Sequence, residues 1–308
     1  MTGGHSHRHT PADTGSGRHR HRLVLVIGIT LTVFIAQVVG GLVSGSLALL
    51  ADAGHMLTDS TGLLIALVAT VLAARPATPA RTFGLQRVEI LAALINGLLL
   101  VGIAVWVLIQ AVDRWSSPAD ISTGVMLGVA LAGAAANLVG LLVLRGGKDD
   151  SLNVRGAYLE VLGDLLGSVA VVVAAVVIAL TGYTRADSLA SVAIFLLIIP
   201  RAWSLLRDVV DVLLEATPRG VDLGQVRDHI REIPGVLDVH DLHAWTITSG
   251  VPVLSAHITV DQQCITRGRS GEVLDRLAEC LGDHFDLDHC TFQLEPEGHQ
   301  AHEPASHR

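Results

Sequence analysis

Two pairs of ionisable side chains lie inside long apolar stretches of the sequence. His55 and Asp59 are four residues apart, and Glu160 and Asp164 have the same spacing in a second apolar stretch. On an α-helix, residues at this spacing project from one face, one turn apart. Imidazole nitrogens and carboxylate oxygens are zinc ligands, and two such pairs on neighbouring helices supply the four groups of a tetrahedral site. The spacing therefore predicts a site for a divalent metal.

Ionisable groups at membrane depth are costly and mark substrate or ion pathways. A lone carboxylate at this depth can instead hydrogen-bond a neighbouring helix. Two pairs on matching faces are harder to explain in that way, because clustered carboxylates without a cation repel one another. A divalent ion removes this repulsion. When the ion leaves, the remaining negative charge attracts protons, so that metal and protons compete for the same groups, as an exchanger requires.

The rest of the chain supplies the helices that such a site needs. Hydrophobic residues make up 50% of the 308 residues and fall in long blocks. Blocks of about 20 uncharged apolar residues are long enough to cross a bilayer as helices. Six spans are expected, at 23–43, 46–74, 90–112, 121–144, 157–180 and from 188 onward. The alternative is five, because Arg201 interrupts the last run; near a helix end, its side chain can extend to the membrane interface.

Arginine and lysine residues are concentrated on one side of these predicted helices. The loops on the side of the two termini carry most of them, whereas the opposite loops offer only Arg114 and Arg185. The positive-inside rule then places both termini in the cytoplasm of a multi-pass protein of the cell (plasma or inner) membrane.

The three cysteines all lie in the last third of the chain. Because three cysteines cannot all pair, a reducing, cytosolic setting is expected for this part.

From Glu215 onward the pattern becomes that of a soluble domain. Apolar residues recur at helical spacing from Leu223 to Ile233 and are followed by alternating, β-branched stretches. The predicted strands are 236–247, 251–260 and 289–294, with a helix at 270–285 between the last two. This α-β-β-α-β order predicts a small α+β domain, with a sheet that carries helices on one face.

These patterns divide the chain into four segments. They are a His-rich tail at 1–22, a six-helix transmembrane metal-transport domain at 23–214, a cytosolic domain at 215–296 and a polar tail at 297–308. Both tails lack an apolar core and are expected to be disordered. The histidines of the first tail either collect metal loosely or are simply solvated.

The net charge of −8 gives no indication of nucleic-acid binding, and no nucleophile–base pair or phosphate-binding loop indicates an enzyme.

Four stretches of the chain resemble characteristic stretches of the cation diffusion facilitator family, in the family's order. They are SGSLALLADAGHMLTDS, FGLQRVEILAALINGLLL, AYLEVLGDLLGS and VHDLHAWTITSG. The resemblance is to the zinc, cadmium and cobalt efflux branch. It implies a homodimer in the lipid bilayer, each protomer having six membrane helices and a cytosolic ferredoxin-like domain. It also implies export of zinc, or in some members cobalt, cadmium, iron or manganese, in exchange for protons, through a site formed by His55, Asp59, Glu160 and Asp164.

Glu160 departs from this family pattern, because the zinc branch usually has histidine at its position. Glutamate adds a charge and replaces a nitrogen ligand by oxygen, which shifts preference towards harder ions although it remains a zinc ligand. A manganese or iron(II) exporter is therefore the alternative to a zinc exporter. A non-transporting metal sensor or partner subunit is the alternative of another class. Such a protein would be expected to lack one or more ligands of the membrane site, whereas four potential ligands are present here.

The resemblance also implies a second metal site, in the soluble domain. His240, His257 and Glu295 match ligand positions there, and Gln293 stands where some members have histidine. Zinc is thus expected both as the transported substrate and as a regulatory ligand, with no organic cofactor. Protons, divalent metal ions and a second copy of the chain are the expected partners, and nucleic acid is not.

Overall fold

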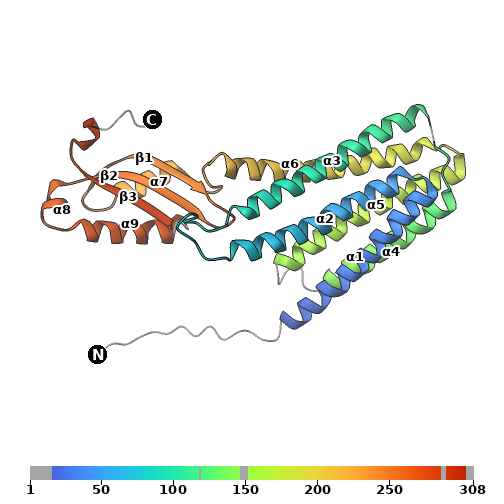
Figure 1. The fold of residues 1–308 in the computed structure, drawn as a ribbon, viewed down its shortest axis with the longest axis horizontal. Coiled ribbons are helices and arrows are strands. Elements are labelled where there is room, and N and C mark those ends of the chain that lie inside the picture. Colours follow the sequence, from blue (N-terminus) through green and yellow to red (C-terminus); the bar gives the residue numbers. More distant parts are fainter. Residues whose placement is uncertain (1–15, 118, 146–151, 286–288, 303–308) are drawn as a thin grey trace. The chain divides into compact units, whose positions relative to one another are not determined.

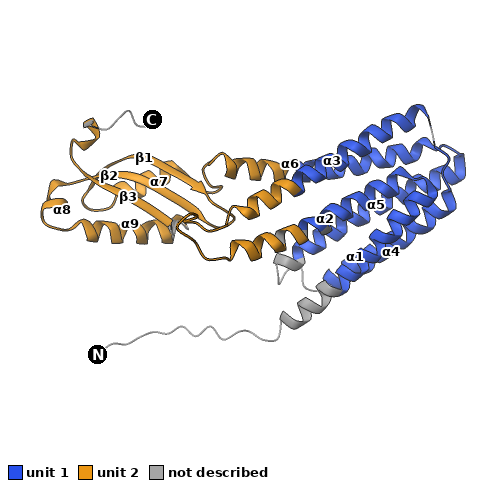
Figure 2. Ribbon diagram, viewed as in Figure 1, with its two compact units in different colours: residues 1–63, 96–203 blue, residues 64–95, 204–308 orange. Residues whose placement is uncertain are grey.

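The computed structural model describes residues 16–117, 119–145, 152–285 and 289–302 of the chain. It divides into two compact units, coloured separately in Figure 2. The first comprises residues 1–63 and 96–203, and the second comprises residues 64–95 and 204–308. Residues 1–15 of the predicted His-rich tail (1–22) lie outside the described residues.

Long helices form the first unit (Figure 1). They are α1 (Ser16–Ser44), α2 (Leu47–Ala73), α3 (Val88–Ser116), α4 (Thr123–Arg145), α5 (Leu152–Thr181) and α6 (Arg185–Leu213). Of these, α1, α4 and α5 lie wholly in the first unit, which also includes the first part of α2, the last part of α3 and the first part of α6. Helix α4 packs along α1 and α5, around a cluster of buried apolar side chains from these helices: Val26, Leu141, Leu144 and Val161.

Five of these helices are long and apolar enough to cross a membrane, in the part of the chain that the structure describes. They are α1 from Leu25, α3, α4, α5 from Arg155, and α6, which meets this criterion despite Arg201. The sixth long helix, α2, carries Asp52, His55 and Asp59 in its first half. Many large apolar side chains on the helices are exposed, as expected where lipid replaces water; examples are Leu42, Leu64, Leu98, Val173 and Leu196. The prediction of a helical membrane domain is confirmed.

Two helices extend into the segments predicted as disordered tails. Helix α1 begins at Ser16, before the predicted domain start at residue 23. The arginines that precede the apolar stretch are good helix formers, so the helix continues through them beyond the hydrophobic pattern. At the other end, a short 3-10 helix, η1, spans His299–His302.

A side chain from α6 fixes the start of α2. Asp187 is buried, and its carboxylate accepts hydrogen bonds from Ser46 Oγ (2.6 Å) and from the backbone N–H groups of Leu47 (2.8 Å) and Ala48 (3.2 Å). The first N–H groups of a helix have no partner within it, and a negative charge is favourable at that end. Arg114 lies 3.7 Å from the same carboxylate and balances its charge. The cap fixes the residue at which α2 begins, and therefore the position of the α2 ligands that follow along the helix.

The second unit contains a three-stranded sheet in the order β1-β2-β3. Its elements are α7 (Leu223–Arg231), β1 (Val236–Thr246), β2 (Pro252–Val260), α8 (Gln262–Thr266), α9 (Ser270–Phe285) and β3 (His289–Pro296). Strand β2 pairs with β1 in antiparallel and with β3 in parallel fashion. Helices α7 and α9 share one apolar core with the sheet, around Val226, Ile230, Leu254, Ile258, Leu277 and Leu281. The predicted α-β-β-α-β order is confirmed, with α8 added between β2 and α9.

Candidate metal centres

The first candidate centre, called the membrane centre below, lies between α2 and α5. His55 and Asp59 come from α2 and Asp164 from α5, and one ligand atom of each lies within 4.8 Å of the others. His55 Nε2 is 3.5 Å from Asp59 Oδ2. Two ligands of a tetrahedral zinc ion, each about 2 Å from the metal, lie about 3.3 Å apart. The arrangement is therefore close to what a zinc ion requires, and small side-chain movements complete it.

The protein leaves the acceptor atoms of this centre available. Among the described residues, none donates a hydrogen bond to Asp164 Oδ1 or Asp59 Oδ2, although both atoms are buried. Buried polar atoms are normally hydrogen-bonded, so each exception requires an explanation. A cation between the two carboxylates would provide one, since the side chains already converge on a common point. The donor set of one imidazole and two carboxylates matches the chemistry of a divalent metal.

Glu160 lies beside the membrane centre without joining it. It is one helical turn before Asp164 on α5 and is half-buried, but it is not among the side chains whose ligand atoms converge within 4.8 Å. Helical spacing fixes the face on which a side chain lies, whereas the rotamer decides where its end group points. The structure thus brings together three of the four predicted ligands and leaves the fourth next to them.

A buried hydrogen-bond network adjoins the centre and was not predicted. Asp52 is buried, and its Oδ2 accepts hydrogen bonds from Gln37 Nε2 at 2.6 Å and from Ser168 Oγ at 3.2 Å. Asp52 precedes His55 by about one turn of α2, and Ser168 follows Asp164 by one turn of α5. The same spacing that indicated the ligands could therefore have indicated these residues. The network links α1, α2 and α5 next to the ligands and fixes these three helices relative to one another.

Arg201 of α6 also reaches the membrane centre. Its Nη1 lies 3.2 Å from His55 Nε2 and 3.9 Å from Asp59 Oδ2. The sequence suggested that this side chain extends to the membrane interface; instead, its guanidinium is directed towards the predicted ligands. No local pattern could have shown this, because the contact depends on how α6 packs against α2.

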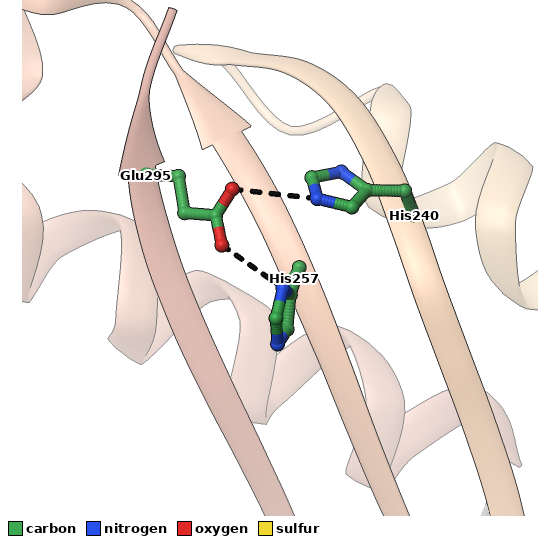
Figure 3. Close-up of side chains that lie close together, drawn as sticks. All are labelled: His240, His257 and Glu295. Atoms are coloured by element: carbon green, nitrogen blue, oxygen red, sulfur yellow. Dashed lines mark ion pairs between the residues drawn. The ribbon is translucent and has the colours of Figure 1, made fainter. Parts of the chain in front are cut away.

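The second candidate centre, called the sheet centre below, lies on the three-stranded sheet. His240 of β1 and His257 of β2 are register partners, and Glu295 of β3 lies beside both (Figure 3). Glu295 Oε2 is 3.3 Å from His240 Nε2, and its Oε1 is 2.9 Å from His257 Nδ1. The two imidazole rings meet edge to face, with centroids 5.4 Å apart. All three side chains singled out in the sequence therefore converge, each with a ligand atom within 4.8 Å of the others.

Strand pairing explains this convergence. His257 pairs with Gln293 of β3, whose Nε2 donates to Glu295 Oε1 at 2.8 Å. Alternate residues of a strand share a face, so Gln293 and Glu295 lie on the side of the sheet that carries the histidines. Asp241 adds a carboxylate 3.9 Å from His257 Nε2, at an irregularity in β1 that follows His240. Asp241 has a positive φ of 47°, and such irregularities redirect side chains, which is why the sequence did not indicate it.

Comparisons with known proteins match most of the chain to one family. The family model described as "Cation efflux transmembrane domain" matches residues 23–214, and that described as "Cation efflux protein, cytoplasmic domain" matches residues 218–297. The chain is 47% identical over 266 residues to the metal cation efflux system protein CzcD of Cupriavidus metallidurans, which covers 86% of this chain and 83% of that protein.

Two further relatives carry names that specify metals. The zinc transporter ZitB of Shigella flexneri is 40% identical over 305 residues, covering 98% of this chain and 95% of the relative. A cadmium, cobalt and zinc/H(+)-K(+) antiporter of Bacillus subtilis is 40% identical over 267 residues, covering 86% of this chain and 85% of the relative. The chain therefore belongs to the cation diffusion facilitator family, in its zinc, cadmium and cobalt efflux branch.

Proposed function

We propose that this chain is an antiporter that exports a divalent metal, chiefly zinc, from the cytoplasm in exchange for protons. The observation that carries the proposal is the convergence of His55, Asp59 and Asp164 on helices of a membrane domain, with buried carboxylate oxygens that accept no hydrogen bond from the described residues. The names of relatives, a zinc transporter and a cadmium, cobalt and zinc antiporter, support the same substrate class. The family is one of transporters, and no enzymatic activity is needed to explain the site.

The metal is the substrate of the membrane centre. His55 supplies a neutral nitrogen, and Asp59 and Asp164 supply oxygen ligands. We assign the fourth ligand to Glu160, which lies one turn from Asp164 on the same face of α5. Three ionised carboxylates carry a charge of −3 against +2 on the ion. When the ion leaves, the excess negative charge in an apolar environment attracts protons, which then return across the membrane on the same groups.

The sheet centre has a different role in this proposal. It lies in the part of the chain that matches a cytoplasmic domain, and its ligands His240, His257 and Glu295 would bind zinc as a regulatory ligand that tightens a homodimer. Both termini are assigned to the cytoplasm of a multi-pass protein in the cell membrane, because the basic residues favour that side. The transport domain is assigned to residues 23–214 and the cytosolic domain to 215–296.

Metal flux in proteoliposomes tests the proposed function. The purified chain is reconstituted, and uptake of zinc, cadmium, cobalt, manganese and iron(II) is followed with and without an imposed pH gradient. We expect zinc uptake that rises with an opposing proton gradient and is lost in Asp59→Asn. Manganese or iron(II) flux above zinc flux would instead favour the alternative that Glu160 suggests. Zinc binding without flux of any metal would contradict transport and favour a sensor.

A further inference from the structure

Arg201 donates to an atom that a metal ion would also require. Arginine carries only hydrogen-bond donors, so at the 3.2 Å contact with Arg201 Nη1 the Nε2 of His55 acts as the acceptor. The lone pair of Nε2 therefore points towards the guanidinium. A zinc ion binds imidazole through the same kind of lone pair, at about 2 Å. The two cations cannot use this lone pair at the same time.

The guanidinium of Arg201 also lies near the second α2 ligand, Asp59. Nη1 of Arg201 lies 3.9 Å from Asp59 Oδ2, the carboxylate atom that lies 3.5 Å from His55 Nε2. A single positively charged nitrogen thus faces both α2 ligands. The guanidinium of arginine is a cation, so it offers a positive charge to both ligands.

The surroundings allow the guanidinium to occupy this position and to leave it. Gly163 lies next to it on α5, where an added Cβ atom would be 3.6 Å from Nη1. A cavity of about 310 Å³ adjoins both His55 and Arg201. Pro200, immediately before Arg201, lies inside α6 and removes one helical hydrogen bond, which makes a local change in the helix direction less costly. About half of the Arg201 side chain (49%) is exposed, so withdrawal requires no repacking of a core.

We propose that Arg201 is a resident cation of the metal-free membrane centre, which its guanidinium must vacate before the metal binds. The inference rests on the proposed function, because it takes His55 and Asp59 as ligands of the transported ion. Arg201 neutralises part of the ligand charge while the centre is free of metal, and it competes with the incoming ion for His55. It thereby weakens metal binding and speeds metal release, which an exporter needs at the far side of the membrane.

The size of the effect follows from occupancy. If the guanidinium holds His55 in about nine of ten metal-free molecules, the apparent metal affinity is about tenfold weaker than the intrinsic one. Removing the guanidinium should therefore increase the apparent metal affinity by about the same tenfold factor. Arg201→Met removes the charge at similar length and Arg201→Gln keeps polarity without charge, whereas Arg201→Lys keeps a cation. The matched control is Arg207→Met, which removes an exposed arginine of the same helix.

The test is zinc titration calorimetry on the detergent-solubilised full-length chain, in a background of His240→Ala and His257→Ala that disables the sheet centre. Zinc should bind about tenfold more tightly to Arg201→Met and Arg201→Gln than to the parent, while Arg201→Lys and Arg207→Met stay within about threefold. In proteoliposomes of the same variants, the half-saturating zinc concentration should fall together with the maximal rate. A role limited to folding would lower the amount of active protein without tightening zinc binding.

Two results would be decisive against the inference or its premise. Unchanged or weaker zinc binding in both Arg201→Met and Arg201→Gln, with binding in the parent abolished by Asp59→Asn, would show that Arg201 does not compete with the metal. Zinc binding in the parent that survives Asp59→Asn would instead contradict the proposed membrane centre itself. The Asp59→Asn arm therefore separates failure of the inference from failure of the proposed function.

Discussion

The membrane centre and the sheet centre use the same kinds of ligand but hold them differently. In the membrane centre, Asp164 Oδ1 and Asp59 Oδ2 are buried and accept no hydrogen bond from the described residues, and Arg201 faces the α2 ligands. In the sheet centre, Glu295 Oε2 likewise accepts no hydrogen bond from the described residues, but the carboxylate forms close ion pairs with both His240 and His257, at 3.3 and 2.9 Å. The first set of ligands comes from two helices and the second from three hydrogen-bonded strands.

This difference has a consequence for what each centre can do with a metal. Ligands fixed by strand register lose little conformational freedom on binding, which suits a metal that stays bound. Ligands on separate helices can move apart when the helices move, and a competing cation favours release. The comparison therefore predicts fast metal exchange at the membrane centre and slow exchange at the sheet centre.

The largest effect is expected from Asp164→Asn. This change keeps the size of the side chain but removes the charge of a ligand in the membrane centre. Loss of an outer partner of a metal ligand already costs about 10- to 100-fold, so loss of a ligand charge should lower zinc flux by about 100-fold or more. Initial rates in proteoliposomes give the answer, with Asp113→Asn, an exposed aspartate of α3, as the matched control. Flux within threefold of the native rate would remove Asp164 from the centre.

The corresponding change in the sheet centre is Glu295→Gln. Zinc binding at this centre should weaken by about 10- to 100-fold, because the carboxylate bridges both histidines. Zinc flux should fall only a few-fold, because the membrane centre keeps its ligands. Sedimentation velocity of the full-length chain with and without zinc, beside the exposed control Glu297→Gln, measures the effect on self-association. If flux fell as far as in Asp164→Asn, the two centres could not have separate roles.

Asp187→Ala tests how the membrane centre is positioned. The change removes the acceptor for Ser46 and for the first N–H groups of α2, and losing a helix cap costs about 0.5–2 kcal/mol. Hydrogen–deuterium exchange should therefore increase at the start of α2, while β1, β2 and β3 remain unaffected. Equal protection of α2 in the variant and the native chain would show that the cap is dispensable.

How much of these centres could be predicted depends on whether the information is local. The ligands of the membrane centre follow from the four-residue spacing within single helices, and the α-β-β-α-β order follows from periodicity and turn residues. The cap by Asp187 and the approach of Arg201 join helices that are far apart in the sequence, so no local pattern specifies them. Asp241 joins the sheet centre through a backbone irregularity, and the position of Glu160 outside the cluster depends on its rotamer.

Glu160→His sharpens the comparison within the membrane centre. Histidine in place of glutamate lowers the ligand charge by one and should raise the ratio of zinc flux to manganese flux, because imidazole prefers zinc. A change of several-fold is expected, smaller than for Asp164, because Glu160 lies at the edge of the cluster. Paired zinc and manganese rates at pH values from about 8 downward measure it. Identical ratios in both proteins would show that Glu160 does not bind the metal.

The smallest effect is expected for Asp238→Asn in the second unit. Partial burial of Asp238 acts to raise its pKa, but the hydrogen bonds from Arg231 (Nη2 at 2.6 Å) and from the Val239 backbone, together with the nearby positive charge of Arg231, outweigh it, and the pKa is lowered. A lowered carboxyl pKa contributes stability above the unfolded-state value, which is lost as the pH falls through the folded-state value. The pair is largely exposed, so the contribution at neutral pH is a few tenths of a kcal/mol.

Chemical unfolding of the native and Asp238→Asn chains at several pH values checks this expectation. The difference in unfolding free energy should be present at pH 7 and should vanish as the pH falls through the lowered folded-state pKa of Asp238. A difference that persisted unchanged in acid would mean that the charge of Asp238 is not its cause.

The central claim is that a divalent metal binds between α2 and α5, and anomalous scattering at the zinc absorption edge tests it most directly. Crystals of the full-length chain grown with zinc should show an anomalous peak about 2.0–2.2 Å from His55 Nε2 and from carboxylate oxygens of Asp59 and Asp164. The guanidinium of Arg201 should have moved away from His55 in the same crystals. A strong peak at His240, His257 and Glu295 with none between α2 and α5 would contradict the account.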